Sequence, residues 1–255
     1  MKDLKAQTPK VHQVKGRHVN SYIIEDDNGL CVVDVAWSGE KYVLGYLKDT
    51  LQRDPRDVNL VVCTHGDPDH IGGVEALAKV CQADIGIPYA THSFTSKFLN
   101  DPTGFLFRFV TGLVESFRPR MWAMYANPNR SLKAKELPAY NPEDLMEDSF
   151  DYTAQMDFRL KHKQTLPGFD DWQVVHTPGH SWDSCCFYHK KSGALITGDT
   201  LLGSKKKGVV VTPAIYSNPI QMRYTLNRLK RLEPKAIYPG HGSYFEGDNL
   251  LAHIG

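Results

Sequence analysis

Residues 64–73 read THGDPDHIGG, and this short stretch holds four side chains that are able to bind a metal ion. They are His65, Asp67, Asp69 and His70. The stretch follows residues 58–64 (VNLVVCT), a nearly continuous apolar run that is typical of a strand buried on both faces. A helix is predicted to start near Gly72. The four side chains would then lie on a loop beyond the carboxyl end of a strand, where open α/β sheets place their ligands.

Three further ligand candidates follow predicted strands in the second half of the chain. They are His180, Asp199 and His241. The strands that lead to them are predicted over residues 172–176, 194–197 and 236–238. An isolated histidine is more often a core or surface group than a ligand, but chance does not explain seven ligand types at the ends of strands. The sequence therefore predicts a metal site.

The rest of the chain alternates between strand and helix patterns. Short β-branched or aromatic stretches predict N-terminal strands at residues 11–15, 20–25 and 30–34. Apolar residues at helical spacing predict helices over residues 39–53 and 218–232. The segment from about 93 to 151 differs, because it is rich in aromatic residues and carries clustered prolines. We interpret it as a mostly helical insertion into an α/β fold.

The composition is that of an ordinary globular enzyme. The 255 residues include 30 basic and 29 acidic side chains, which leaves a formal net charge of +1. This balance gives no general reason to expect nucleic acid as a partner. The N-terminal residues MKDLKAQTPK lack the apolar run of a secretory signal, and no stretch approaches the roughly 18 apolar residues of a spanning helix. We expect no membrane-spanning segment and a cytoplasmic location.

Cysteine ligation of the metal is not expected. The five cysteines, at positions 31, 63, 81, 185 and 186, form no CxxC pair. Cys185 and Cys186 are adjacent, a spacing that rarely forms a structural disulfide. We expect reduced and mostly buried thiols.

Four phrases of the sequence resemble the metallo-β-lactamase superfamily: THGDPDHIGG at 64–73, TPGHS at 177–181, ITGDTL at 196–201 and YPGHG at 238–242. The signature of that family is HxHxDH, followed by a distant His, an Asp and a final His. Within the family, the GHS, GDT and PGHG phrases most resemble the glyoxalase II-like hydrolases. The resemblance implies a four-layer αββα sandwich, with residues 1–255 as a single domain and a helical insertion at about 93–151.

The resemblance also implies a site for two metal ions. The implied ligands are His65, Asp67 and His180 for the first metal, Asp69, His70 and His241 for the second, and Asp199 as a bridge between them. One position departs from the signature, because Asp67 stands where the family has its second histidine.

The added carboxylate of Asp67 shifts the metal preference from zinc toward manganese or iron, although zinc also accepts carboxylate oxygen. We expect two divalent metal ions, with zinc as the first expectation and manganese or iron as alternatives. In another interpretation Asp67 does not bind metal and caps the following turn, which would leave one metal strongly bound.

The candidate residues favour hydrolysis by an activated water. Two cations about 3.5–4 Å apart share a water and lower its pKa toward neutrality. No GxSxG motif is present, so an acyl-enzyme has no support. Asp69 would orient the hydroxide, and Tyr216 could donate a hydrogen bond to a developing oxyanion, although a packed loop tyrosine is more common. Our main hypothesis is a binuclear hydrolase that uses a metal-bound hydroxide to cleave a small ester, thioester or lactone.

Other functions remain open at this stage. Phosphodiester or nucleic-acid hydrolysis gains from the HxDxDH pattern, which also occurs in the hydrolase-like domain of bacterial DNA-uptake channel proteins. The three lysines at 205–207 could grip a carboxylate or phosphate or form a solvated turn. The balanced charge argues against nucleic acid. Iron-dependent persulfide oxidation is an alternative of another class, and the nearly complete ligand set disfavours a non-catalytic binding module.

The predicted insertion has several possible roles. Apolar residues recur near helical spacing from Phe94 to Phe117, with Arg108 among them. They could form a helical pair packed on the main body, a lid over an apolar pocket, a homodimer contact or a membrane-surface helix. A lid would favour a small-molecule substrate with an apolar portion. We interpret His92, which follows a predicted strand, as structural.

Overall fold

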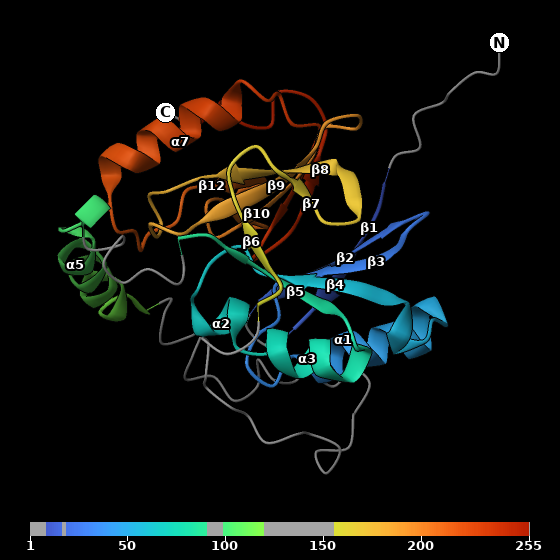
Figure 1. The fold of residues 1–255 in the computed structure, drawn as a ribbon. Helices are drawn as coiled ribbons and strands as arrows, with labels where there is room; N and C mark the ends of the chain where they lie inside the picture. The colour runs from blue at the N-terminus through green and yellow to red at the C-terminus, as the bar shows by residue number, and fades with distance from the viewer. Residues whose placement is uncertain (1–8, 17–18, 91–98, 120–155, 255) are drawn as a thin grey trace.

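The computed structural model describes residues 9–16, 19–90, 99–119 and 156–254. Two sheets face each other, and helices cover their outer sides, so that the layers run helix, sheet, sheet, helix (Figure 1). Helices α1 and α3 pack on the first sheet, and α7 packs on the second. The α/β sandwich expected from the sequence is therefore confirmed.

The first sheet has the strand order β1-β2-β3-β4-β5-β6. Its strands are β1 (Lys10–Lys15), β2 (Asn20–Asp26), β3 (Gly29–Val33), β4 (Val58–Val62), β5 (Asp84–Pro88) and β6 (Phe158–Leu160). Strands β1 to β3 are antiparallel, and β3 to β6 are parallel. The carboxyl ends of β3 and β4 therefore meet at the same edge of the sheet.

The second sheet has the strand order β14-β13-β10-β9-β8-β7. Its strands are β7 (Thr165–Leu166), β8 (Phe169–His176), β9 (Cys185–His189), β10 (Ala194–Gly198), β13 (Ala236–Pro239) and β14 (Phe245–Glu246). Strands β10 and β13 are parallel, and the other neighbours are antiparallel. A separate hairpin consists of β11 (Leu202–Ser204) and β12 (Val209–Val211).

Most helices match the apolar periodicity of the sequence. The described α-helices are α1 (Glu40–Tyr46), the one-turn α2 (Pro68–Ile71), which is too short to show a period, α3 (Val74–Cys81), α5 (Gly104–Ser116) and α7 (Pro219–Lys230). The helix predicted over 39–53 is α1, continued by a π-helical turn (Leu47–Leu51) and ended by Gln52 in the left-handed conformation, φ 54°. A short 3₁₀ turn (Pro55–Asp57) then leads into β4.

The main core lies between the two sheets and follows from the alternation of side chains along each strand. In β2, Tyr22 faces the second sheet, while its neighbour Ile23 faces the helices. Strand β4 is buried on both faces, as predicted, because Val62 faces the second sheet and Val61 packs toward the helices. Trp172 of β8 is among the largest fully buried side chains. Each such side chain contributes about 1.5–3 kcal/mol by leaving water.

The stretch after β4 differs from the loop predicted there. Pro68 begins the one-turn helix α2, which carries Asp69 and His70. Proline suits the first position of a helix because its φ is already helical and it has no N–H to satisfy. Asp67 occupies the N-cap position, but its side chain makes no capping hydrogen bond. The side-chain capping bond of the alternative interpretation is therefore not formed, and metal binding by Asp67 stays a prediction.

Only part of the predicted insertion at about 93–151 is described, namely residues 99–119 with helix α5. His92 and the other residues of this segment lie outside the described ranges, and the single-domain organisation stays a prediction. Large apolar side chains of α5 and its C-cap are exposed, with Phe105 at 85% and the C-cap residue Phe117 at 77%. A lid, a homodimer contact and a membrane-surface helix stay predictions for this exposed apolar face.

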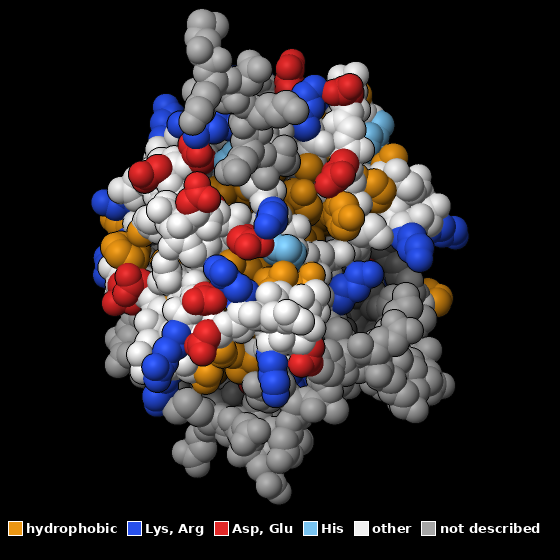
Figure 2. Space-filling model, turned by 90° about the vertical axis from the view of Figure 1, so that its right-hand side faces the viewer, with side chains coloured by type: hydrophobic (Ala, Val, Ile, Leu, Met, Phe, Trp, Pro, Cys, Tyr) orange, Lys and Arg blue, Asp and Glu red, His pale blue; other side chains and the backbone are white. Residues whose placement is uncertain are grey.

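Other expectations from composition agree with the structure. All five cysteines are buried as free thiols. Among the described helices, none has both the length and the apolar character needed to cross a bilayer. On the face shown in Figure 2, acidic and basic side chains are interspersed, with apolar side chains between them, which agrees with the net charge of +1.

Candidate metal centre

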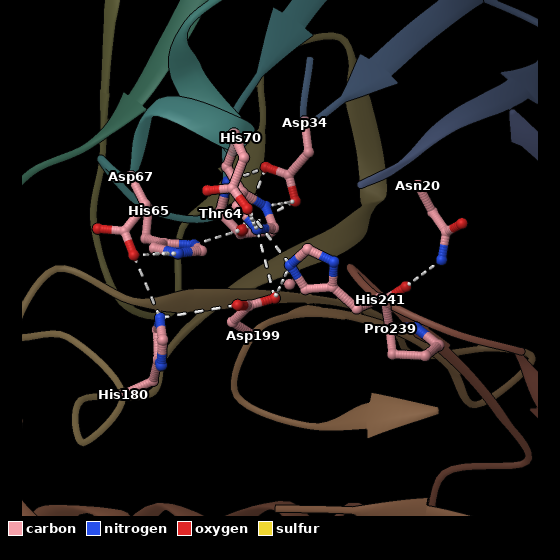
Figure 3. Close-up of polar contacts among 12 residues, drawn as sticks. Asn20, Asp34, Thr64, His65, Asp67, His70, His180, Asp199, Pro239 and His241 are labelled. Carbon is pink, nitrogen blue, oxygen red and sulfur yellow. Dashed lines mark hydrogen bonds and ion pairs between the residues drawn. The ribbon is translucent and has the colours of Figure 1, made fainter. Parts of the chain in front are cut away.

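The seven predicted ligands come together at one edge of the two sheets, and all of them except Asp69 are labelled in Figure 3. From the first sheet, the chain beyond β4 supplies His65 and Asp67, and α2 supplies Asp69 and His70. From the second sheet, the residues beyond β8, β10 and β13 are His180, Asp199 and His241. Each ligand candidate thus follows the carboxyl end of a buried strand, as the sequence predicts.

His65, Asp67 and His180 form a first group. Their candidate ligand atoms lie within 4.8 Å of one another. The Asp67 Oδ2 atom lies 3.3 Å from Nε2 of His65 and 3.4 Å from Nε2 of His180. We call these three residues the first group, since they are the ligands expected for the first metal.

Asp69, His70 and His241 form a second group with the same 4.8 Å limit between ligand atoms. The Asp69 Oδ2 atom lies 3.4 Å from Nε2 of His241 and 3.9 Å from Nε2 of His70. Asp199 lies between the groups, because its Oδ1 is 3.3 Å from Nε2 of both His70 and His241. Its Oδ2 is 3.8 Å from Nε2 of His180 in the first group.

Three buried atoms in this cluster make no hydrogen bond with any residue that the structure describes. They are Nε2 of His65, Nε2 of His70 and Oδ1 of Asp199. Leaving a buried polar atom without a partner costs about 1–3 kcal/mol, so such atoms call for an explanation. A cation would satisfy all three, since imidazole nitrogen and carboxylate oxygen are ordinary metal ligands. The residues therefore fit a metal centre.

Two glycines allow the ligand-bearing loops to approach one another. A Cβ on Gly240 would lie 2.6 Å from Cε1 of His70 and 2.9 Å from Oδ1 of Asp199. A Cβ on Gly198, whose φ is 48°, would lie 2.2 Å from Oγ1 of Thr64. Any side chain at either position would push the loops apart, because these contacts are below the van der Waals limit.

Asp34 orients the second group although we did not identify it from the sequence. This buried carboxylate follows β3 and accepts hydrogen bonds from N and Oγ1 of Thr64 and, at 2.8 Å, from Nδ1 of His70. With Nδ1 engaged, His70 presents Nε2 to the cluster, which is the usual arrangement behind a ligating histidine. Asp34 has φ 59°, a left-handed conformation that Asp tolerates better than most residues.

Backbone groups hold other members of the cluster in place. Nδ1 of His180 donates to the carbonyl of Ile215 at 2.9 Å, so its Nε2 faces Asp67 and Asp199. The loop that carries His241 is attached to β2, because Nδ2 of Asn20 donates to the carbonyl of Pro239 at 3.0 Å (Figure 3). The second sheet is thereby fixed to the first beside the site.

Arg108 is the second site residue that sequence reasoning missed. From α5, its Nη1 and Nη2 donate to Oδ1 and Oδ2 of Asp67 at 3.0 and 2.5 Å. Arg108 and Asp67 are about one-quarter exposed. Such a fork geometry is the strong form of an arginine–carboxylate pair. The only sequence signal for this contact is a single charged residue within an apolar helical pattern.

The carboxylates of the centre stay ionised. Burial alone would raise the pKa of Asp67, but His65, His180 and Arg108 hold it well below its usual range. Burial acts in the same direction on Asp199, and the neighbouring histidines of the second group hold its pKa well below the usual range as well. Both side chains are therefore available as anionic ligands near neutral pH.

The pKa values of the histidines in the second group are shifted in the opposite direction, upward. Burial would lower the pKa of His70, but Asp34 and Asp199 raise it well above its usual value. Burial also acts to lower the pKa of His241, while Asp199 and Asp69 raise it to about 10. Without a metal these imidazoles hold protons, which a binding cation would have to displace.

The remaining candidates lie in different surroundings. Tyr216 packs against the apolar cluster beneath α7, and its backbone N and O contact Oγ1 of Thr111 on α5. The three lysines at 205–207 are exposed at the turn of the β11–β12 hairpin. A catalytic role for Tyr216 stays a prediction.

A cavity of about 430 Å³ opens beside the second group. Its lining includes Asp69, Trp37, Lys41 and Tyr42. The indole of Trp37 is 50% exposed, and Nζ of Lys41 lies 5.4 Å from the centre of the Tyr42 ring. The cavity thus offers an aromatic wall and a cation next to a candidate ligand.

A family model and a curated relative both relate this chain to metal-dependent hydrolases. The model of the metallo-beta-lactamase superfamily matches residues 14–241. The probable metallo-hydrolase YqjP of Bacillus subtilis (strain 168) is 24% identical over 193 residues, which cover 73% of this chain and 54% of that protein. The chain spans little more than half the length of the first curated relatives it matches.

Two further likenesses concern a shorter segment and the fold. An atrochrysone carboxyl ACP thioesterase of Aspergillus fumigatus is 35% identical over 74 residues, 29% of this chain and 21% of that protein. The crystal structure of the metallo-beta-lactamase family protein TTHA1429 from Thermus thermophilus has a TM-score of 0.59 and 20% identity. The match covers 96% of this chain and 77% of that one, and it shows a shared fold.

Proposed function

The chain belongs to the metallo-beta-lactamase superfamily, and from this membership we propose that it is a two-metal hydrolase of a small ester, thioester or lactone. One observation carries the proposal. Seven His and Asp side chains converge on one edge of the sandwich, and three buried ligand atoms among them have no hydrogen-bond partner in the described chain. A purely structural zinc site would usually rely on cysteine, and none of the candidate ligands is a cysteine.

We assign the ligands by the two groups. The first group (His65, Asp67 and His180) would hold one divalent ion, the second group (Asp69, His70 and His241) the other, and Asp199 would contact both. Imidazole and carboxylate donors suit zinc, manganese and iron alike. When bound, the metals would supply Lewis acidity that lowers the pKa of a water and polarises the acceptor oxygen of the substrate.

The residues of the chain supply orientation. Asp34 and the carbonyl of Ile215 keep Nε2 of His70 and of His180 directed at the centre. We propose that Asp69 orients the attacking water. Burial acts to raise the pKa of Asp69, but His241 and His70 outweigh that effect and lower it, so this carboxylate is ionised and able to accept a hydrogen bond from the water.

Oxyanion stabilisation by Tyr216 belongs to the same proposal. The support is its position next to Ile215, whose carbonyl accepts from His180. A hydroxyl that donates to the developing oxyanion would lower the barrier by up to about 3 kcal/mol. The exchange Tyr216→Phe tests this step, because it should lower kcat and leave KM nearly unchanged.

The substrate class is proposed from the cavity beside Asp69. Trp37 and Tyr42 would contact an apolar or aromatic portion, and Lys41 would contact a carbonyl or carboxylate. The thioesterase likeness over 74 residues supports a thioester among the candidates. The glyoxalase II-like phrases of the sequence favour the same bond type.

Elemental analysis followed by a substrate panel tests the proposal. Protein loaded with Zn²⁺, Mn²⁺ or Fe²⁺ would be offered esters, thioesters, lactones and phosphodiesters. We expect two metals per chain, cleavage of an acyl compound, and loss of both metal and activity in His65→Ala and Asp199→Ala. The exchange His12→Ala, on β1 and outside the ligand groups, is the matched control. Unchanged activity in the two ligand variants would contradict the proposal.

A further inference from the structure

Arg108 makes the two ligand groups electrically unequal. Its guanidinium donates to both oxygens of Asp67, the only carboxylate in the first group. The same Asp67 Oδ2 atom faces Nε2 of His65 and Nε2 of His180 at 3.3 and 3.4 Å. A cation that uses this oxygen would therefore sit close to a fixed positive charge.

The second group has the opposite surroundings. Asp69 is one of its members, and Asp34 lies behind His70 with a 2.8 Å hydrogen bond to Nδ1. Among the described residues, no lysine or arginine forms an ion pair with Asp34, Asp69 or Asp199. A carboxylate behind a ligating histidine raises the basicity of the ligand and adds negative charge near the metal.

The carboxylates near the two ligand groups also leave the second group with more negative charge than the first. Asp183 lies on the first side, where its Oδ2 accepts from the backbone N of Gly66 at 2.9 Å. Because Arg108 neutralises Asp67, Asp183 supplies the remaining negative charge near the first group. The second side keeps Asp69 and also Asp34, which contacts His70 directly and reaches His65 of the first group only through the hydroxyl of Thr64. Asp199 is shared by both sides.

We propose that the second group binds a divalent cation first and more tightly, and that Arg108 is the residue that weakens the first position. The guanidinium competes with the metal for the electrons of Asp67 and repels its charge. Both effects are stronger in a partly buried site than in water, because the effective dielectric constant there is lower. This inference rests on the proposed two-metal site, and it adds an order of loading and a residue that sets it.

A second contact of helix α5 provides a control variant for the removal of Arg108. The described polar contacts of this helix to the body include Oγ1 of Thr111 with the backbone of Tyr216, at 3.3 and 3.4 Å, in addition to the Arg108 pair. The exchange Thr111→Val removes that second attachment without changing any charge. It therefore separates a loosened helix from a lost guanidinium.

Calorimetric titration of EDTA-treated protein with Zn²⁺, supported by elemental analysis at limiting metal, tests the proposal. We expect two steps in the wild type. The tighter step should disappear in His241→Ala and the weaker one in His180→Ala. In Arg108→Met the weaker step should tighten by at least about tenfold, the lower end of the range for residues behind a ligand. Arg108→Lys, which keeps the charge, and Thr111→Val should stay near the wild type.

Several results would overturn the inference. One is loss of the tighter step in His180→Ala. Another is weaker binding at the first position in Arg108→Met, as expected for Asp67→Asn, since Arg108 would then only position the ligand. The third is the same tightening in Thr111→Val. Two equal steps in the wild type would also refute the inference but leave the proposed function intact, whereas no metal binding at all would refute both.

Discussion

Asp67 and His70 lie three positions apart in one short stretch, yet the residues behind them carry opposite charges. Asp34, from the end of β3, accepts a hydrogen bond from His70, while Arg108, from α5, donates two to Asp67. The motif therefore supplies the ligand atoms, but a residue from another part of the fold decides how strongly each atom attracts a cation. Substitutions at these residues and changes of pH test that difference.

Removal of Asp34 should have the largest effect. In Asp34→Ala the buried Nδ1 of His70 and the hydroxyl of Thr64 lose their acceptor, and Ala is strained at φ 59°. We expect about 3–5 kcal/mol less stability, measured by urea unfolding, as for other broken buried pairs. Metal at the second position should bind roughly 10–100-fold more weakly.

The exchange Asp34→Asn is the matched variant, since Asn keeps the shape and tolerates the left-handed backbone. It should recover much of the stability but not the metal affinity, because the negative charge stays absent. Equal metal affinity in Asp34→Asn and the wild type would show that the charge behind His70 has no effect on the site.

The pH dependence of the metal-free protein should show a smaller difference. His70 and His241 have raised pKa values in the folded chain, about 10 for His241. A raised folded pKa stabilises the fold below the unfolded value of about 6.5, and this stability is lost as the pH rises toward 10. We expect EDTA-treated protein to lose roughly 1–3 kcal/mol between pH 6.5 and 9 in urea unfolding.

The carboxylates act at the other end of the pH range. Asp67 and Asp199 have lowered folded pKa values, so their contribution to the free energy of unfolding is present above about pH 3.9 and is lost as the pH falls through the folded values.

Added Zn²⁺ should reverse the loss of stability at alkaline pH, because a ligating imidazole must give up its proton. An alkaline optimum for the metal-free protein would contradict this account.

The parts of the site that the sequence predicts are those encoded locally. Asp199 and His241 follow short buried strands, and a hydrophobic run followed by a polar residue is visible without any knowledge of packing. Asp34 follows the buried β3 in the same way and could have been found by the same rule. It was missed because it is not itself in the ligand set of the resemblance.

Other features depend on packing that no local pattern carries. Arg108 lies 41 residues from Asp67, on a helix whose other conspicuous side chains are apolar. Its contact exists because α5 is placed over the first group, which helical periodicity does not predict. The one-turn helix α2 was missed for a different reason, since four residues are too few to show a period.

Replacing Asp67 with the histidine of the family signature should have a moderate effect. Asp67→His removes the carboxylate that Arg108 neutralises and gives the first group three imidazoles. We expect the preference for Zn²⁺ over Mn²⁺ at the first position to rise by about tenfold, because imidazole favours zinc and carboxylate suits manganese. Competition between the two metals, followed by elemental analysis, measures the ratio. An unchanged ratio and occupancy would show that Asp67 is not a ligand.

The three lysines at 205–207 should have the smallest effect, because their charge, unlike that of Arg108, lies on an exposed hairpin turn. Exposed charges contribute little to stability and are screened by salt. Replacing all three with alanine should change the free energy of unfolding by less than about 0.5 kcal/mol and leave acyl hydrolysis unaltered. Kinetics on an ester and a phosphodiester, at low and high salt, check this. A selective loss of phosphodiester cleavage would instead favour the nuclease-type alternative, because the three lysines would then contact the phosphate of the substrate.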